Sequence, residues 1–300
     1  MDQIISFLMS LLPILSTILA ALVPAQTTPV YSSCQIPTGS VHLIAHRGLS
    51  ADAPENTLPA FRLAGETGFW GAECDTLTTA DGVWVVMHDD SVDRMTNGGG
   101  NVSDLTFDEI SALTVDAGRN IEQYPNTGVP TLAEYLDVCR EYGMHAVIEI
   151  KSSVALDRLD SLADLLGARE EKDRFILVSM NLDICSRIKE LMPETAVYLV
   201  TIGTAETVGA IPFALAHKLD GLDLSYLHSA NAVRLVKAAG LKTMVWTVDS
   251  VRKAERYWRW GVRDMTTNAL TPTPPEGNAL QQWLWNLRDY LYQTLSAWAA

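Results

Sequence analysis

The sequence predicts an α/β fold, a (β/α)8 barrel, on three observations. From Val41 onward, short apolar runs alternate with amphipathic segments of helical period, a pattern typical of βαβ units around a parallel sheet. The 300 residues are enough for one such barrel, which typically takes about 250. Finally, the Asp81-Gly82 turn is a hairpin signal that removes one of the strand candidates from the ring and leaves eight.

Residues 1–25 form the first element, because Ile4 to Ala25 is apolar and carries no charge. Its length suits a signal peptide, a single membrane anchor or a helix packed on the domain. The first basic residue is Arg47, so flanking charge does not set an orientation. We expect an anchored or exported protein that associates with a membrane through this segment. Residues 26–40, polar with Pro and Gly, predict a linker.

The barrel is expected over residues 41–270. Its strand candidates are 41–46, 70–76, 83–88, 145–151, 175–180, 196–201, 220–225, 243–248 and 262–267. Its helical patterns are 57–67, 131–143, 155–171, 182–192, 205–218, 229–239 and 251–260. The hairpin sets 83–88 antiparallel to 70–78, in a register that brings His88 beside Glu73. Parallel strands joined by helices then make up the rest of the ring.

A small insertion of about 77–130 is expected after the second strand, because the Gly- and Asn-rich stretch that follows the hairpin is too long for a plain loop. Thr106 and Glu109 form a capping-box pattern and predict one short helix there. After the barrel, residues 271–300 predict a Pro-rich spacer and an amphipathic helix, packed on the barrel or docked on a membrane.

Composition excludes some classes of function. The formal net charge is −14, from 22 Lys and Arg against 36 Asp and Glu, and a nucleic-acid partner would need a basic face. The four cysteines are widely spaced without a C-x-x-C pair, which gives no support for a zinc or thioredoxin-like site. We expect ordinary, mostly buried thiols, with a disulfide left open if the chain is exported.

Three carboxylates predict a metal site. Glu73 and Asp75 are two residues apart on one strand, so their side chains point to the same face and would repel without a cation. Glu149 stands among β-branched residues near the end of another strand, where a charge without a partner is costly. Oxygen ligands of this kind favour Ca²⁺ or Mg²⁺ over zinc, so we expect one divalent cation.

Histidines and cations at strand ends complete a candidate site. His46 and His88 are expected at the barrel mouth, where active sites of this fold gather, as an acid/base pair. Arg47 and Lys151 could bind phosphate at the same mouth. Trp246 ends an apolar strand and either lines the mouth or packs in the core. Together these residue types point to cleavage of a phosphate ester.

Residues 41–268 resemble the glycerophosphodiester phosphodiesterase family. The matching motifs are His46-Arg47-Gly48, Ala53-Pro54-Glu55-Asn56-Thr57, Glu73-x-Asp75, Thr79-x-Asp81-Gly82, His88-Asp89, Asp93-Arg94, Thr96-Asn97-Gly98, Val129-Pro130-Thr131-Leu132, Glu149-Ile150-Lys151 and Trp246-Thr247-Val248. Two positions depart from the family pattern. Cys74 lies between the carboxylates and is expected to face away from them. The last strand ends in Asp264-Met265-Thr266-Thr267-Asn268-Ala269-Leu270, whereas the family typically ends in an Asp followed shortly by Pro.

The resemblance implies a TIM barrel that hydrolyses small-molecule glycerophosphodiesters to sn-glycerol 3-phosphate and an alcohol. It implies the following roles: His46 and His88 as acid and base; Glu73, Asp75 and Glu149 as metal ligands; Arg47 and Lys151 on the phosphate; Glu55, Asn56 and Trp246 in support. Two alternatives stay open. One is a phospholipase D-like or phosphoinositide-cleaving enzyme that acts on intact or lyso-phospholipid, and the other is a non-catalytic phosphodiester-binding module.

Overall fold

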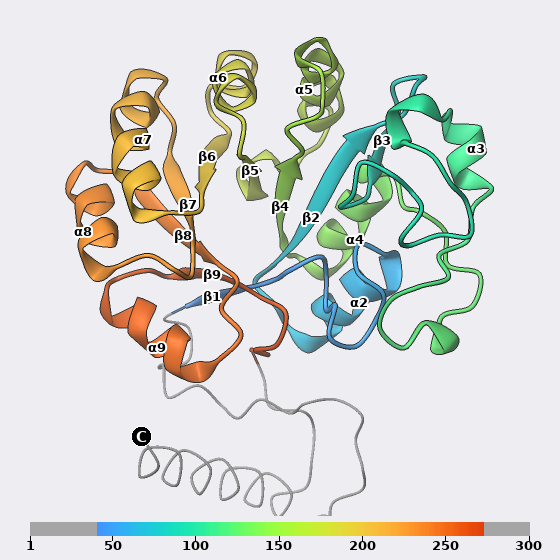
Figure 1. Ribbon diagram of the computed structural model, residues 1–300, viewed down its shortest axis with the longest axis horizontal. Helices are drawn as coiled ribbons and strands as arrows, with labels where there is room; N and C mark the ends of the chain where they lie inside the picture. Colours follow the sequence, from blue (N-terminus) through green and yellow to red (C-terminus); the bar gives the residue numbers. More distant parts are fainter. Residues whose placement is uncertain (1–40, 273–300) are drawn as a thin grey trace, which may run out of the picture. The chain divides into compact units, whose positions relative to one another are not determined.

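The structure, a computed structural model, describes residues 41–272, and in this range eight parallel strands close into a barrel (Figure 1). Closure comes from β1, which pairs with β2 on one side and with β9 on the other. The strands are β1 His42–Ala45, β2 Gly71–Thr78, β3 Trp84–Val86, β4 His145–Ile150, β5 Phe175–Ser179, β6 Ala196–Thr201, β7 Gly221–Ser225, β8 Lys242–Trp246 and β9 Asp264–Thr267. The predicted (β/α)8 architecture is confirmed.

The helices lie outside the ring of strands (Figure 1). They are α2 Leu58–Thr67, α3 Phe107–Ser111, α4 Leu132–Tyr142, α5 Leu159–Gly167, α6 Leu182–Leu191, α7 Thr204–Ala216, α8 Ala230–Ala238 and α9 Val251–Arg259. Single 3₁₀ turns are η1 Val102–Asp104, η2 Ile121–Gln123, η3 Leu156–Arg158 and η4 Lys172–Arg174. Each helical pattern expected from the sequence corresponds to one of these α-helices within a few residues at either end.

The strand β3 leaves the ring as predicted, because it pairs antiparallel with β2 alone. Gly82 adopts a positive φ of 86° in the turn, which glycine tolerates without strain. The register pairs Thr76 with Val86, one residue away from the predicted register. The ladder of β3 ends there, and the Met87 N–H then donates to the Asp75 carbonyl at 3.0 Å. His88 is therefore carried to the mouth of the barrel next to the carboxylate strand.

The barrel interior is closed by apolar side chains below the mouth. Inward-facing residues of five strands form one buried cluster: Ile44, Val147, Ile176, Val178, Tyr198, Val200 and Met244. Strands buried on both faces have continuous apolar sequences. A charged residue within such a sequence therefore marks a position where the charge needs a partner. The packed interior also means that ligands can enter only at an end of the barrel.

The helix α4 holds β2 in position through Tyr135. A capping box of Thr131 and Glu134 starts the helix, and Gly143 with a φ of 67° ends it. Tyr135 is fully buried and donates its hydroxyl hydrogen bond to the Ala72 carbonyl of β2 at 2.7 Å. Its ring packs edge-on against Phe61 of α2, with 4.7 Å between ring centroids. Two helices thus clamp the strand that carries Glu73 and Asp75.

Tyr135→Phe is expected to lower the free energy of unfolding by about 1 kcal/mol, because it removes one buried hydrogen bond and keeps the ring packing. Urea unfolding measures this change. Tyr142→Phe is the matched control, since its hydroxyl donates to Glu66 at the surface, and a change within about 0.5 kcal/mol is expected. Equal changes in both variants would contradict the proposed clamp.

The insertion after β3 contains α3, and its capping box of Thr106 and Glu109 forms as predicted. Arg94 ties the insertion to the barrel loops by donating to Asp89 at 2.5 Å and to Glu55 at 2.6 Å. The insertion therefore fixes Asp89, the direct neighbour of His88, in place.

The predictions for residues 1–25, 26–40 and 273–300 lie outside the described residues. Within residues 41–272, no helix is both long and apolar enough to cross a membrane. In the same range Cys74, Cys139 and Cys185 are buried free thiols.

Candidate active site

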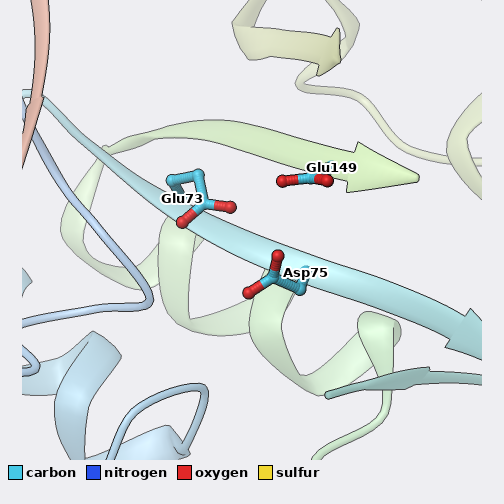
Figure 2. A group of neighbouring side chains, drawn as sticks. All are labelled: Glu73, Asp75 and Glu149. Atoms are coloured by element: carbon cyan, nitrogen blue, oxygen red, sulfur yellow. The ribbon is translucent and has the colours of Figure 1, made fainter. Parts of the chain in front are cut away.

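Three carboxylates meet at the mouth of the barrel. Glu73 and Asp75 of β2 and Glu149 of β4 each offer an oxygen, and these oxygens lie within 4.8 Å of one another. Figure 2 shows the three carboxyl groups close together between the two strands. The parallel register pairs Asp75 with Glu149, which accounts for their proximity. The predicted ligand set is thus brought together by two neighbouring strands.

Burial makes this cluster electrostatically costly. Glu73 and Asp75 are only 5% and 1% exposed. Burial first, and then the charge of Asp75, raises the pKa of Glu73 well above its usual range and that of Glu149 to about 7. Burial also acts to raise the pKa of Asp75, but Lys151 and Arg47 outweigh it and lower that pKa. The charged form is therefore favoured for Asp75 and disfavoured for Glu73 and Glu149.

A divalent cation fits this site on donor chemistry. Three carboxylates supply hard oxygen ligands of the kind that Ca²⁺ and Mg²⁺ take, and no thiol or imidazole belongs to the cluster that the described residues form. Cys74 lies between Glu73 and Asp75 in sequence and is fully buried, and it does not line the cavity at the mouth. It faces the other side of the strand, as expected.

Ca²⁺ or Mg²⁺ is expected to raise the midpoint of thermal unfolding more at about pH 8 than at about pH 6, because metal and protons compete for the carboxylates. Without metal, the raised pKa of Glu149 means that the free energy of unfolding falls as the pH rises from about 4.5 to about 7, because the charged form is disfavoured in the folded protein. Differential scanning calorimetry with and without chelator measures both effects. An equal metal-induced shift at the two pH values would contradict competition with these protons.

Two cations border the carboxylates. Arg47 adopts a left-handed φ of 59°, and its backbone N–H donates to Glu73 Oε2 at 2.9 Å. Its guanidinium pairs with Asp75 at 3.3 Å and with Glu55 at 3.0 Å. Lys151 donates from Nζ to Asp75 and to Glu149, each at 3.2 Å. Both predicted phosphate-binding residues therefore lie at the cluster.

The two predicted supporting residues of the Pro54-Glu55-Asn56-Thr57 segment also contact the site. Asn56 donates from Nδ2 to Asp75 Oδ2 at 2.8 Å, and its Oδ1 accepts from the Asp75 backbone N–H at 3.2 Å. Glu55 accepts from Arg47 and from Arg94, at 3.0 and 2.6 Å. These bonds fix the carboxylate of Asp75 and the guanidinium of Arg47 in their orientations.

His46 has a neutral partner. Its Nδ1 lies 2.7 Å from Asn268 Oδ1, and the Asn268 amide donates from Nδ2 to Asp249 Oδ2 at 3.2 Å. Because the amide nitrogen of Asn268 is turned to Asp249, its oxygen must accept from His46, which places the proton on Nδ1 and leaves Nε2 free. Nε2 lies 3.9 Å from Glu73 Oε2. Burial, and then Arg47, lowers the pKa of His46, so the neutral ring is favoured.

His88 has a charged partner. Its Nδ1 lies 2.6 Å from Asp89 Oδ1. Hydrogen bonds from Arg94, the largest cause, lower the pKa of Asp89 to about 2, so this carboxylate is always ionised near neutral pH. A carboxylate at Nδ1 orients the ring and stabilises a protonated imidazole. The two histidines thus differ in the charge of the group behind them.

Both histidines, both cations and two of the three carboxylates face one cavity of about 140 Å³ at the barrel mouth. Its lining is His46, Arg47, Glu73, His88, Glu149, Lys151, Val178, Met180, Val200, Asp223, Trp246 and Thr266. Trp246 lines the mouth and also packs against the interior cluster, so both roles considered from the sequence apply. Glu55, Asn56 and Asp75 support the cavity without being part of its lining.

Sequence reasoning missed four residues of the site: Asn268, Asp249, Asp89 as a partner of His88, and Asp223. Asp223 could have been found, because it is a charge inside the apolar run of β7 and so has the same signature as Glu149. The remaining histidines lie away from the cavity lining. His42, for example, bonds Asp264 at 2.7 Å and stacks on Trp70.

The closed parallel barrel and the acidic site at its mouth define a TIM-barrel enzyme. A model of the glycerophosphoryl diester phosphodiesterase family matches residues 46–271. The chain belongs to the glycerophosphoryl diester phosphodiesterase family and is a phosphoric diester hydrolase.

Similar proteins and solved structures carry the name of the same class of enzyme. The chain is 34% identical over 233 residues to a glycerophosphodiester phosphodiesterase of Caldanaerobacter subterraneus subsp. tengcongensis, which covers 75% of this chain and 93% of that protein. It is 35% identical over 191 residues to glycerophosphodiester phosphodiesterase 1 of Mus musculus, across 62% of this chain and 54% of that protein. An Oleispira antarctica phosphodiesterase, solved with the product sn-glycerol-3-phosphate, superimposes with a TM-score of 0.70 at 26% identity, over 83% of this chain and 96% of that one.

Proposed function

We propose that this enzyme hydrolyses glycerophosphodiesters to sn-glycerol 3-phosphate and an alcohol, with a divalent cation and an acid/base pair of histidines. The observation that carries the proposal is the single cavity lined by both histidines, two of the three carboxylates, Arg47 and Lys151. The Oleispira antarctica enzyme with bound sn-glycerol-3-phosphate supports the substrate class.

Glu73, Asp75 and Glu149 would hold one Ca²⁺ or Mg²⁺, which supplies charge stabilisation at the phosphoryl oxygens when bound. Arg47 and Lys151 border the same carboxylates, so a phosphate drawn to the cation would also meet their N–H groups. Positive charge placed before the reaction stabilises the additional negative charge that develops as phosphorus becomes five-coordinate.

The two histidines have different partners, and we assign each histidine a different proton transfer on this basis. His46, with a neutral amide at Nδ1 and a free Nε2, is suited to accept the proton of the attacking hydroxyl or water. His88, backed by ionised Asp89, is suited to give a proton to the alkoxide that leaves. One P–O bond forms to the nucleophile and one breaks to the alcohol, so each proton has a stated origin and destination.

The test is release of sn-glycerol 3-phosphate from glycerophosphocholine by the full chain, followed by a coupled dehydrogenase assay. Release is expected with Ca²⁺ or Mg²⁺ and is expected to stop with excess chelator. Asp264→Asn is the matched control, because Asp264 is a carboxylate of the barrel that bonds His42 and does not line the cavity. Metal-independent release, or none with either cation, would sink the proposal.

A second substrate class is favoured by an apolar rim at the mouth, made of exposed residues that follow β5, β6 and β7: Met180, Leu182, Ile202, Tyr226 and Leu227. Exposed apolar side chains clustered beside a site suggest contact with an apolar group. The rim could hold the acyl chain of a lysophospholipid whose phosphate occupies the cavity.

The rim is tested with the double variant Ile202→Ser, Leu227→Ser. The ratio of kcat/KM for lysophosphatidylcholine to that for glycerophosphocholine is expected to fall about tenfold or more, because each buried aliphatic side chain contributes roughly 1.5–3 kcal/mol. An unchanged ratio would leave only the water-soluble diesters as substrates.

We also propose a membrane-anchored or exported location, supported by the apolar sequence of residues 4–25. Fractionation of expressing cells, compared with a chain lacking residues 1–25, tests it. Equal distribution of both chains in the soluble cell interior would contradict it.

A further inference from the structure

A second cavity, of about 250 Å³, lies at the carboxyl end of β2, where the insertion meets the loop after β4. We call it the outer pocket. Its lining is Leu77, Thr78, Asp90, Asn101, Val102, Ser103, Ser153 and Val154. Among the described residues, none belongs to both this lining and that of the cavity at the barrel mouth. The outer pocket is therefore a separate space, and its occupant follows from its position and its chemistry.

Three segments of the chain connect the outer pocket to the active site. In each segment, an active-site residue is followed two positions later by a residue of the pocket lining. The pairs are Asp75 and Leu77, His88 and Asp90, and Lys151 and Ser153. Two residues of extended chain span at most about 7 Å. The outer pocket therefore adjoins the active site on the side of His88 and Lys151.

The position beside His88 relates the outer pocket to the leaving alcohol. In the proposed reaction His88 gives its proton to the oxygen that leaves, and a proton donor has to lie within hydrogen-bond reach of that oxygen. The alcohol half of the diester is then next to His88, so a cavity that adjoins this residue is placed to receive its head group. The apolar rim follows β5, β6 and β7 and lies at other strands of the ring.

The lining combines apolar side chains with one carboxylate. Leu77, Val102 and Val154 are buried, with 5% or less of each exposed. Asp90 is exposed and accepts a hydrogen bond from the Ser153 hydroxyl at 2.5 Å, which joins the insertion to the loop after β4. A carboxylate has further lone pairs for a second donor. Within residues 41–272, no Lys, Arg or His lines the outer pocket.

This lining suits a head group with a positive nitrogen on a short hydrocarbon arm. The ammonium would meet the carboxylate of Asp90, and the methylene or methyl groups would meet the apolar side chains. A neutral polyhydroxyl head group gains no charge attraction there, and an anionic one is repelled. Because Asp90 is exposed, the attraction is modest, so it alters the choice between substrates more than the overall rate.

We propose that the outer pocket is a head-group subsite for an ammonium-bearing alcohol of the ethanolamine or choline class, with Asp90 as the residue that sets the preference. The inference rests on the proposed function, because it takes His88 as the acid that faces the leaving alcohol. Asp90 determines specificity and takes no part in proton transfer.

The test compares kcat/KM for glycerophosphocholine with kcat/KM for glycerophosphoinositol, whose head group is neutral, on the full chain with Ca²⁺ or Mg²⁺. Release of sn-glycerol 3-phosphate measures both. The parent chain is expected to prefer the choline diester. This ratio is expected to fall about two- to fivefold in Asp90→Asn, the range of an exposed ion pair. It is expected to fall about tenfold or more in Asp90→Lys, because a like charge replaces an opposite one.

Asp108→Lys is the matched control. It makes the same change in net charge at an exposed position of α3, outside the lining of the outer pocket, and is expected to keep the ratio of the parent chain. Salt provides a second readout, since it screens exposed charges. A rise to about 1 M is expected to lower the ratio of the parent chain and to leave that of Asp90→Asn unchanged.

Thermal unfolding separates a change in specificity from a loss of the fold. Asp90→Asn keeps an acceptor oxygen for Ser153, so it tests the charge even where Asp90→Lys unfolds. A parent chain that releases product from both diesters without preference, or an equal fall of the ratio in Asp108→Lys, would overturn the subsite alone. An unchanged ratio in Asp90→Asn and Asp90→Lys would do the same. A parent chain that releases product from neither diester would overturn the proposed function and, with it, the subsite.

Discussion

His46→Ala and His88→Ala are each expected to lower kcat for glycerophosphocholine by about 10²–10⁴, the usual contribution of a positioned acid or base. The reason is that each ring transfers a different proton, and each is held by its own partner, Asn268 or Asp89. KM is expected to change far less than kcat, because Arg47 and Lys151, and neither histidine ring, are the residues proposed to bind the phosphate. Steady-state kinetics with saturating metal measures the effect.

The leaving group separates the two roles. A glycerophosphodiester with a p-nitrophenyl leaving group needs no proton on departure, so His88→Ala should recover much of its rate with this substrate. His46→Ala should stay equally impaired with both substrates, because the nucleophile still has to lose its proton. Recovery in His46→Ala in place of His88→Ala would reverse the assignment of base and acid. Wild-type rates in either variant would remove that histidine from the mechanism.

Glu73→Gln is expected to lower metal-dependent activity by about 10³, because a cation in such a site contributes several kcal/mol of charge stabilisation. The same variant is expected to be at least as stable as the parent chain at about pH 8 without metal. The pKa of Glu73 is raised by burial and by Asp75. A negative charge on this carboxyl therefore opposes folding at pH values above its usual pKa. A neutral amide of the same shape relieves that cost.

Two measurements check the pair of expectations. Calorimetric titration with Ca²⁺ and Mg²⁺ should show weaker binding in Glu73→Gln, and thermal unfolding in chelator should show an equal or higher midpoint. Asp264→Asn is again the control, since it changes a carboxylate of the barrel that lies outside the cavity lining. Full activity in Glu73→Gln, or a large loss of stability without metal, would refute a metal role for this carboxylate.

The sequence was sufficient for the features that depend on local pattern. The alternation of apolar runs and amphipathic helices, the Asp81-Gly82 hairpin and the shared face of Glu73 and Asp75 follow from periodicity and turn chemistry. Glu149 was identified because a charge in an apolar strand needs a partner. The hairpin register was one residue off, because the number of residues in the turn is not specified by an Asp-Gly pair alone.

The contacts that depend on tertiary closure were not predictable in this way. The bond of His46 to Asn268 joins residues 222 positions apart, and it requires the exact lateral pairing of β1 with β9. The chain of contacts from Glu55 through Arg94 to Asp89 likewise depends on how the insertion folds back. Polar residues in loops carry no periodic pattern, so their partners emerge only from the three-dimensional arrangement.

Because β1 pairs with β9, catalysis is expected to depend on completion of the chain. A nascent or truncated chain that ends before Asn268 would already contain both histidines and every carboxylate of the cluster. It would still lack the amide that sets the tautomer of His46, since that amide arrives with the last strand of the ring. Contacts of such long sequence separation form slowly, because the entropy of loop closure has to be overcome first. Hydrolytic competence is therefore expected to appear only when the ring closes, which makes activity a direct reporter of ring closure.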